Sequence, residues 1–215
     1  MTAPADRTAT TVTALPATRT APAGKAEAAG KTAPVEFRGR APRYRFGLKG
    51  RSAAQWLLAH GLSVPAAPNT WVGEAGADPL PASDTLLVAR LGSSEFFLED
   101  REDGATLRDL DPGVTNSPTN YPAGVYPVLR QDAAFLLSGE GSLDVLAQVC
   151  NVNFGELALE SNPLIMTLMV GVAVLVIPQV IGGARQFKIW CDPTFGAYLA
   201  ESVGTVVVES GGKHA

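Results

Sequence analysis

Two stretches of the chain that begin 89 residues apart share one pattern of glycine and apolar residues. The first begins at Phe46 and the second at Phe135, and in each a short apolar run reaches a glycine, Gly50 or Gly139, before an amphipathic helical pattern. Glycine suits such a strand-to-helix corner, where a side chain would crowd the turn. The pattern therefore predicts two related strand–helix units. Their apolar helix faces are expected to contain Ala54, Leu57, Leu58 and Gly61 in the first unit, and Leu143, Leu146, Ala147 and Cys150 in the second.

The residues after each helix extend the match. Apolar runs at 85–91 and 95–99 follow the first helix, and runs at 166–177 and 186–191 follow the second. Each half therefore has the predicted order strand–helix–strand–strand, and together they predict an α+β domain of internally duplicated units with helices on antiparallel sheet. The alternative is coincidence between two ordinary strand–turn–helix units. A last helix is expected to follow, with one face formed by Phe195, Tyr198, Leu199 and Val203.

The apolar run 164–181 has nearly the length of a membrane-spanning helix, which needs about 20 apolar residues. It contains Thr167, Gly171 and Pro178, and many of its residues are β-branched valines, which favour a pleated surface. We expect one long buried strand, or two short strands bent near Gly171. A single membrane span remains the rival interpretation.

The N-terminal segment has a different composition from the rest. Residues 1–44 consist mostly of Ala, Thr, Pro and Gly, so they bury too little apolar surface to offset the entropy of ordering. We expect an arm over 1–44 that is disordered alone, one domain over 45–209, and a short tail over 210–215. The arm is either solvated or orders on a partner subunit, for which its X-Pro steps suit an extended backbone.

Charge and cysteine content exclude several classes of protein. Lys and Arg number 17 against 21 Asp and Glu, a net charge of −4, which argues against nucleic-acid binding. Two cysteines cannot form a disulfide framework and lack zinc-site spacing. The first 30 residues hold no apolar segment of a secretory signal, so we expect a cytoplasmic protein.

Each candidate for chemistry has a simpler structural interpretation. Gly139 and Gly141 resemble a dinucleotide fingerprint, but Asp144 stands where the third glycine belongs and would repel a pyrophosphate. His60 lies at a predicted helix end, where the helix dipole stabilises it, and His214 lies near the end of the chain; neither has triad partners nearby.

The remaining polar candidates are also assigned structural roles. Cys150 and Cys191 are expected to be small buried hydrophobes. The acidic segment 99–103 is expected to be a solvated loop, Ser52 with Gln55 a helix capping box, and Asp192 an N-cap. We therefore expect no catalytic, cofactor-binding or metal-binding residue on this chain, which would act by contact.

Four segments in the same order resemble a known family: Arg45–Gly50, Leu91–Leu98, Arg130–Gly139 and Phe187–Leu199. Together they are similar to the gamma subunit of heterotetrameric sarcosine oxidase, over roughly residues 45–203. The resemblance implies a fold like the folate-binding domain of the glycine cleavage T-protein. One departure is the segment 204–208, a poor helix sequence where the resemblance implies that the last helix continues; it either continues the helix or is extended after an early helix end.

The resemblance also implies a function. The chain would be the small non-catalytic subunit of a complex that oxidatively demethylates sarcosine and passes the one-carbon unit to tetrahydrofolate. It would carry no cofactor itself; FAD, FMN, NAD and tetrahydrofolate would sit on larger partner subunits. The alternatives are a stand-alone folate-dependent aminomethyltransferase, or the small subunit of a related N-methyl amine dehydrogenase. Since Arg and aromatic residues are enriched at interfaces, the expected partner contacts are Arg38, Arg40, Arg43, Tyr44 and Trp71.

Overall fold

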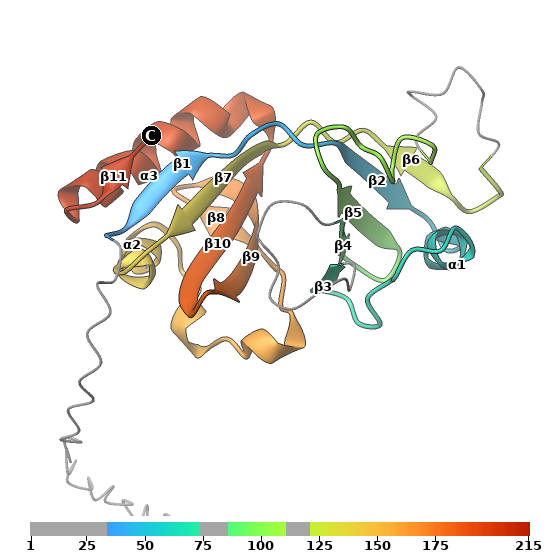
Figure 1. Ribbon diagram of the computed structural model, residues 1–215, viewed down its shortest axis with the longest axis horizontal. Helices are drawn as coiled ribbons and strands as arrows, with labels where there is room; N and C mark the ends of the chain where they lie inside the picture. The colour runs from blue at the N-terminus through green and yellow to red at the C-terminus, as the bar shows by residue number, and fades with distance from the viewer. Residues whose placement is uncertain (1–33, 74–85, 111–120) are drawn as a thin grey trace, which may run out of the picture. The chain divides into compact units, whose positions relative to one another are not determined.

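Two β-sheets with helices packed on them form the folded part of the chain (Figure 1). The computed structural model describes residues 34–73, 86–110 and 121–215, all within a compact unit that runs from Thr32 to Ala215. The α+β class predicted from the sequence is confirmed.

The first sheet has five strands in the order β3-β4-β5-β2-β6, and every neighbouring pair is antiparallel. Helix α1 (Ala53–Ala59) packs on this sheet through Trp56 and Leu57, which join Phe46 and Phe96 in one apolar core. The strands are β2 (Arg45–Lys49), β3 (Thr70–Gly73), β4 (Leu87–Arg90), β5 (Glu95–Glu99) and β6 (Tyr126–Val128).

The second sheet has six strands in the order β11-β1-β7-β10-β9-β8, antiparallel except for the parallel pair β1 and β11. Helices α2 (Ser142–Val149) and α3 (Gly196–Glu209) contribute to its core. The other elements are β1 (Glu36–Gly39), β7 (Ala133–Ser138), β8 (Ile165–Met169), β9 (Val172–Ile181), β10 (Ala184–Cys191), β11 (Lys213–His214) and the 3₁₀ turns η1 (Phe154–Glu156), η2 (Leu159–Ser161) and η3 (Pro193–Phe195).

The two halves of the chain follow the same order of elements. β2, α1 and the meander β3-β4-β5 in the first half correspond to β7, α2 and the meander β8-β9-β10 in the second. The strand before each unit pairs in the other half's sheet: β1 lies beside β7, and β6 lies beside β2, both antiparallel. Two segments of chain, 40–44 and 129–132, therefore cross between the sheets (Figure 1).

The predicted order of strands needs correction. Three strands, not two, follow the helix in each half, because Thr70–Gly73 forms β3 and the apolar run 164–181 divides into β8 and β9. Of the two forms expected for that run, two strands is the observed one, and they join in a hairpin through Val170 and Gly171, both with positive φ. Among the described residues, no helix is long and apolar enough to span a membrane.

Both predicted helix faces are rotated from the observed ones. In α1 the buried residues are Ala53, Trp56 and Leu57, whereas Leu58 is exposed. In α2, Val145 and Val149 are buried with Leu146, and Ala147 is exposed. In α2 the valines are buried because the second sheet decides which side of this short helix is covered. The prediction of a capping box is wrong. The Ser52 side chain makes no cap hydrogen bond, and its hydroxyl donates to the Ala123 carbonyl oxygen instead.

The predicted boundaries of the domain are too narrow at both ends. Val35 and Phe37 are buried and β1 lies inside the second sheet, so the part of the supposed arm from 34 to 44 belongs to the fold. The supposed tail 210–215 contains β11, which pairs with β1. The remainder of the arm, residues 1–33, lies outside the described residues.

Of the two conformations left open for the end of the last helix, the helical one is observed. The segment 204–208 continues α3 to Glu209, because burial of Val203 and Val207 against the second sheet outweighs the low helix propensity of valine. Leu199 is buried as expected, but Phe195 and Tyr198 are exposed and do not share its face. Gly204 allows the imidazole of His214 to lie against the helix, and this ring stacks on Phe37.

Candidate functional site

The two sheets meet through an apolar contact that we call the junction cluster. Phe97 of the first sheet and Trp190 of the second lie edge to face, with ring centroids 5.4 Å apart. Trp71 of β3 packs against this cluster, and its backbone N–H donates to the Asn162 carbonyl oxygen. The buried members of the junction cluster are Leu87, Ala89, Leu91, Phe97, Leu164, Leu175, Ile177 and Trp190.

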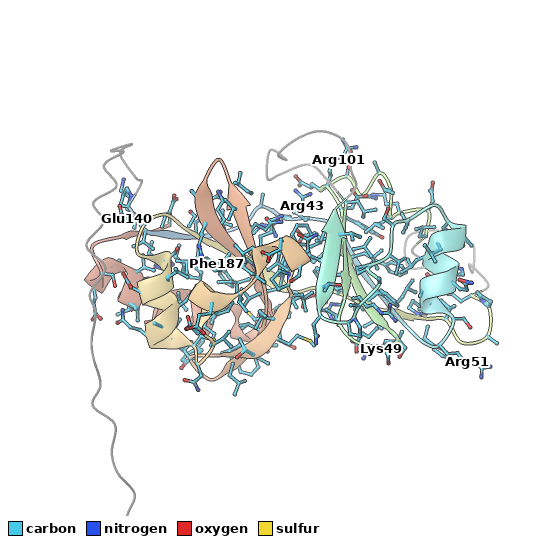
Figure 2. All side chains as sticks on the ribbon, turned by 90° about the horizontal axis from the view of Figure 1, so that it is seen from below. Arg43, Lys49, Arg51, Arg101, Glu140 and Phe187 are labelled. Atoms are coloured by element: carbon cyan, nitrogen blue, oxygen red, sulfur yellow. The ribbon has the colours of Figure 1, made fainter. Side chains whose placement is uncertain are left out.

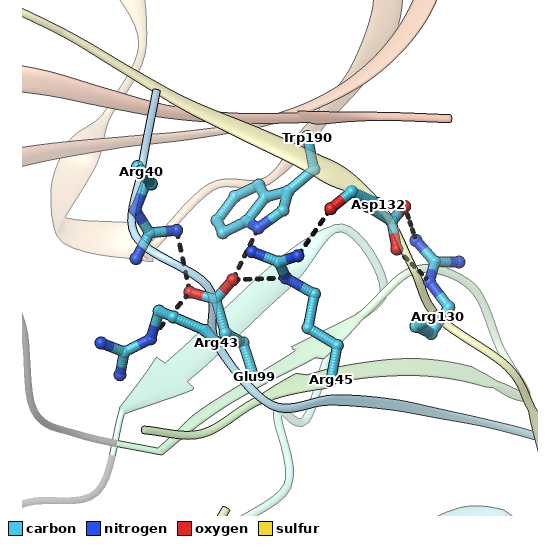
Figure 3. A network of polar contacts seen from close by, with 7 residues as sticks. All are labelled: Arg40, Arg43, Arg45, Glu99, Arg130, Asp132 and Trp190. Carbon is cyan, nitrogen blue, oxygen red and sulfur yellow. Dashed lines mark hydrogen bonds and ion pairs between the residues drawn. The ribbon is translucent and has the colours of Figure 1, made fainter. Parts of the chain in front are cut away.

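A buried carboxylate lies at one side of the junction cluster (Figure 3). Glu99, at the end of β5, is only 2% exposed and is surrounded by three arginines and an indole. Its Oε1 lies 2.8 Å from Arg40 Nη1 and 3.4 Å from Arg43 Nε. Its Oε2 accepts hydrogen bonds from Arg45 Nε at 2.8 Å and from Trp190 Nε1 at 2.7 Å. We call these five residues the Glu99 cluster.

Ionisation of Glu99 is the net result of opposed effects. Burial alone would raise the pKa of the carboxyl group, but the positive charges of Arg40 and Arg45 and the hydrogen bonds from Arg45 and Trp190 hold its pKa below the ordinary value. Burial lowers the pKa of Arg40, although Glu99 opposes that shift. The Glu99 cluster is therefore a fixed, ionised group with more positive than negative charge.

The second crossing segment completes the polar network. Arg130 makes a bidentate ion pair with Asp132, with nitrogen–oxygen distances of 3.0 and 2.9 Å, and its guanidinium lies 4.8 Å from the centroid of the Phe97 ring. Arg45 Nη1 donates to the Asp132 carbonyl oxygen at 2.6 Å, which links the start of β2 to the second crossing segment (Figure 3). The network fixes the two sheets against each other.

A basic hollow of about 400 Å³ opens beside the Glu99 cluster. Lys188 of β10 lines it, and burial lowers the pKa of this ammonium to about 8, with repulsion from Arg40 adding to the shift and attraction by Glu99 opposing it. The lining residues are Arg38, Arg40, Ala41, Pro42, Arg43, Arg101, Glu102, Leu136, Gln186 and Lys188.

A second hollow, of about 690 Å³, lies on another side of Trp190 and is bounded partly by Met166 and Leu168 of the edge strand β8. Cys191 also borders it, but burial raises the pKa of this thiol to about 11, with Asp132 and Asp192 adding to the shift, so the thiol is protonated at neutral pH. Cys191 is therefore a poor nucleophile at neutral pH.

The predicted partner contacts occupy different environments. Arg40 and Arg43 are mostly buried in ion pairs with Glu99, and Tyr44 lies under the guanidinium of Arg108 at 5.3 Å and packs on the first core. Trp71 packs on the junction cluster, and Arg38 is exposed. Contact of these residues with a partner stays a prediction; within the chain, most of them join the sheets.

The histidine, aspartate and cysteine candidates occupy structural environments within the fold. His60 is the C-cap of α1, with Nδ1 2.7 Å from the Trp56 carbonyl oxygen and its ring tilted against the Trp56 indole. Asp192 accepts hydrogen bonds from the Thr194 hydroxyl and from the Thr194 backbone N–H, which lower the pKa of its carboxyl group, and it is the N-cap of η3 as predicted. Cys150 and Cys191 are buried, as expected. In residues 34–73, 86–110 and 121–215, no three His, Cys, Asp or Glu side chains form a metal-binding group.

The interpretation of 99–103 as a solvated loop is wrong at its first two residues. Glu99 ends β5, and Asp100 is also 2% exposed because its Oδ2 accepts the backbone N–H groups of Thr106 and Leu107. The sequence signal for Glu99 was the apolar run that precedes it and the charge of Arg45, which lies directly opposite in β2.

Comparison with known proteins identifies similar solved structures. No family model and no curated protein matches the chain. A chain of heterotetrameric sarcosine oxidase from Corynebacterium sp. U-96 superposes with a TM-score of 0.62 and 22% identity, covering 84% of this chain and 87% of that chain. The glycine cleavage system aminomethyltransferase T from Bartonella henselae superposes with a TM-score of 0.57 and 15% identity, covering 80% of this chain and 45% of that one. The chain therefore has a T-protein-like fold, and its length is similar to that of the sarcosine oxidase chain, of which the superposition covers 87%.

Proposed function

We propose that this chain is a small non-catalytic structural subunit of a sarcosine oxidase-like heterotetrameric flavoenzyme. That enzyme would oxidatively demethylate an N-methyl amino acid such as sarcosine and pass the one-carbon unit to tetrahydrofolate. The observation that carries the proposal is the similarity in fold and length to a chain of heterotetrameric sarcosine oxidase, with the aligned region covering most of both chains.

The segments that resemble the gamma subunit support this proposal by their positions. Arg45, Phe97, Arg130 and Trp190 come from the four different segments and meet around the junction between the sheets. Phe97 contacts both Trp190 and Arg130, and Arg45 shares the Glu99 carboxylate with Trp190, so the resemblance is concentrated in residues that maintain the shape of the chain. Such a role fits a subunit that acts by presenting a surface.

We also propose that the two halves are copies of one ancestral unit that resembles the folate-binding domain of the T-protein. The matching order of elements, the mutual exchange of β1 and β6, and the glycine corners at Gly50 and Gly139 support it. On this proposal FAD, FMN, NAD and tetrahydrofolate lie on the larger flavoprotein and folate-binding subunits, in the cytoplasm, and the predicted N-terminal arm contacts those subunits through the residues before β1.

The test is purification of the tagged full-length chain from its native cells. We expect larger polypeptides that carry flavin to co-purify in fixed ratio, and sarcosine to bleach the flavin absorbance of the complex. Purification of the chain alone, or of partners without flavin, would contradict the proposal. Bleaching without oxygen consumption would instead identify a related N-methyl amine dehydrogenase.

A second measurement distinguishes the proposed structural subunit from the alternative, a stand-alone folate-dependent aminomethyltransferase. The chain spans less than half of the aminomethyltransferase that it superposes on. We expect the isolated full-length chain to show no saturable binding of tetrahydrofolate in calorimetry, and binding at micromolar concentration would favour the alternative.

A further inference from the structure

The basic hollow gathers cationic side chains from three separate parts of the chain. Arg38, Arg40 and Arg43 come from β1 and the crossing segment that follows it, Arg101 follows β5, and Lys188 lies on β10. A hollow of about 400 Å³ is large enough for a phosphate group or a small dicarboxylate. Arg43 and Arg101 lie away from the other labelled cations, Lys49 and Arg51 (Figure 2).

Positive charge in the basic hollow exceeds the negative charge that the chain supplies. Glu99 is shared among Arg40, Arg43 and Arg45, so this cluster alone has three positive charges against one negative charge. Glu102 lines the hollow itself, Arg38 lies 3.9 Å from Glu36, and Arg101 makes an exposed ion pair with Asp103 at 3.3 Å. The excess of positive charge therefore comes from the Glu99 cluster and Lys188. Lys188 makes no ion pair or hydrogen bond with any described residue, and it lies close enough to Arg40 to be repelled by it. Burial and the repulsion from Arg40 outweigh the attraction of Glu99, so the charged form of Lys188 is disfavoured and an added anion would stabilise it.

Lys188 occupies the position in the second sheet that matches Phe97 in the first sheet. In β10, Lys188 pairs with Leu136 of β7, and the corresponding pair in the first sheet is Phe97 with Gly47. A phenylalanine of the junction cluster is thus matched by a lysine that lines the hollow. Lys188 is not a member of the junction cluster, and its charge is available to a ligand in the hollow that it lines.

We propose that the basic hollow binds an oxyanion, a carboxylate or phosphate group held by Lys188, Arg43 and Arg101. Guanidinium groups bind such anions through paired N–H donors, and the ammonium adds a point charge. The oxyanion is either a free small molecule or an acidic group of a partner. The inference does not depend on the proposed function, because it rests on the charge and shape of this chain alone.

The test measures thermal unfolding of the full-length chain in inorganic phosphate and in chloride at matched ionic strength. We expect phosphate to raise the midpoint temperature in a saturable way, because a ligand that binds only the folded state stabilises it. Lys188→Gln and Arg101→Gln should each weaken the apparent phosphate affinity about tenfold, the loss expected for one charged hydrogen bond of about 1.4 kcal/mol.

Arg51→Gln is the matched control, since Arg51 is exposed and does not line the hollow. It should leave phosphate binding unchanged. Equal effects of phosphate and chloride on the wild-type chain, or an equal loss in Arg51→Gln, would overturn the proposal.

Two preparations distinguish the source of the oxyanion. If a partner's acidic group occupies the hollow, phosphate will bind the isolated chain but not the complex purified from native cells. If the ligand is a free anion, phosphate will bind both. Phosphate binding to neither preparation would refute the site, whatever partners co-purify.

Discussion

Replacing Glu99 by glutamine should destabilise the fold strongly, because the substitution removes the one negative charge among three buried arginines. At an effective dielectric constant of about 20, two unit charges about 4 Å apart attract by about 4 kcal/mol, and desolvation offsets part of this. Arg40 and Arg45 each lie 2.8 Å from the carboxylate. Breaking a buried pair leaves its partner uncompensated and costs about 3–5 kcal/mol, which lowers the midpoint temperature by about 6–20 °C for a chain of this length.

Urea unfolding followed by tryptophan fluorescence measures this loss, because the Trp190 indole donates to Glu99 and lies in the junction cluster. Glu95→Gln is the matched control: Glu95 lies in the same strand and pairs with Lys49 at 3.1 Å, but both side chains are at least a third exposed. The control should cost less than about 1 kcal/mol. Equal costs for Glu99→Gln and Glu95→Gln would refute the reasoning that the buried charges join the sheets.

The pH dependence gives a second check on Glu99. Its folded-state pKa lies below the ordinary value of 4.5, so the stabilisation is fully present above that value and is lost as the pH falls through the folded pKa. The wild-type chain should therefore lose more stability on acidification than Glu99→Gln does. Parallel stability profiles for the two proteins below pH 5 would contradict the assigned pKa direction.

Two further substitutions test other parts of the second sheet. Gly204→Ala places a methyl group where the His214 imidazole lies, so it should cost about 1–3 kcal/mol by overpacking, and His214→Ala in the same chain should restore most of the loss in thermal unfolding. For Lys188 the folded pKa of about 8 lies below the ordinary 10.5, so the unfolded chain binds more protons between these values and stability rises with pH there. Lys188→Met in chloride buffer should abolish that rise and stabilise the fold at pH 7 by up to about 3 kcal/mol; an unchanged rise would contradict it.

The parts of the fold that could be predicted from the sequence are those determined by residues close together in the chain. The glycine corners at Gly50 and Gly139 both have positive φ, and α1 and α2 begin three residues after them. Local steric demands and apolar periodicity determine these features, so they appear in a single sequence. The rotated helix faces show the limit, since the sheet decides which side of a short helix is buried.

Pairings between distant residues could not be predicted in the same way. β1 has four residues, of which only Phe37 is buried, so it lacks the alternation that identifies a strand. It becomes a strand because β7, about 100 positions later, supplies its hydrogen-bonding partners. The Glu99 cluster was missed for the same reason, because a carboxylate at a strand end resembles the start of a loop until the arginines are placed around it.

The two halves carry different residues at matching positions of β5 and β10, where the two sheets meet. Glu99 pairs with Arg45 in the first sheet, and Trp190 pairs with Ala134, the residue equivalent to Arg45, in the second, so Glu99 and Trp190 are counterparts that contact each other. Two glutamates there would repel, and two tryptophans would leave an indole N–H without this acceptor. A carboxylate facing an indole satisfies both groups in one arrangement. The exchanged strands bring Arg40 to the same point, so the difference between the halves fixes how the sheets dock.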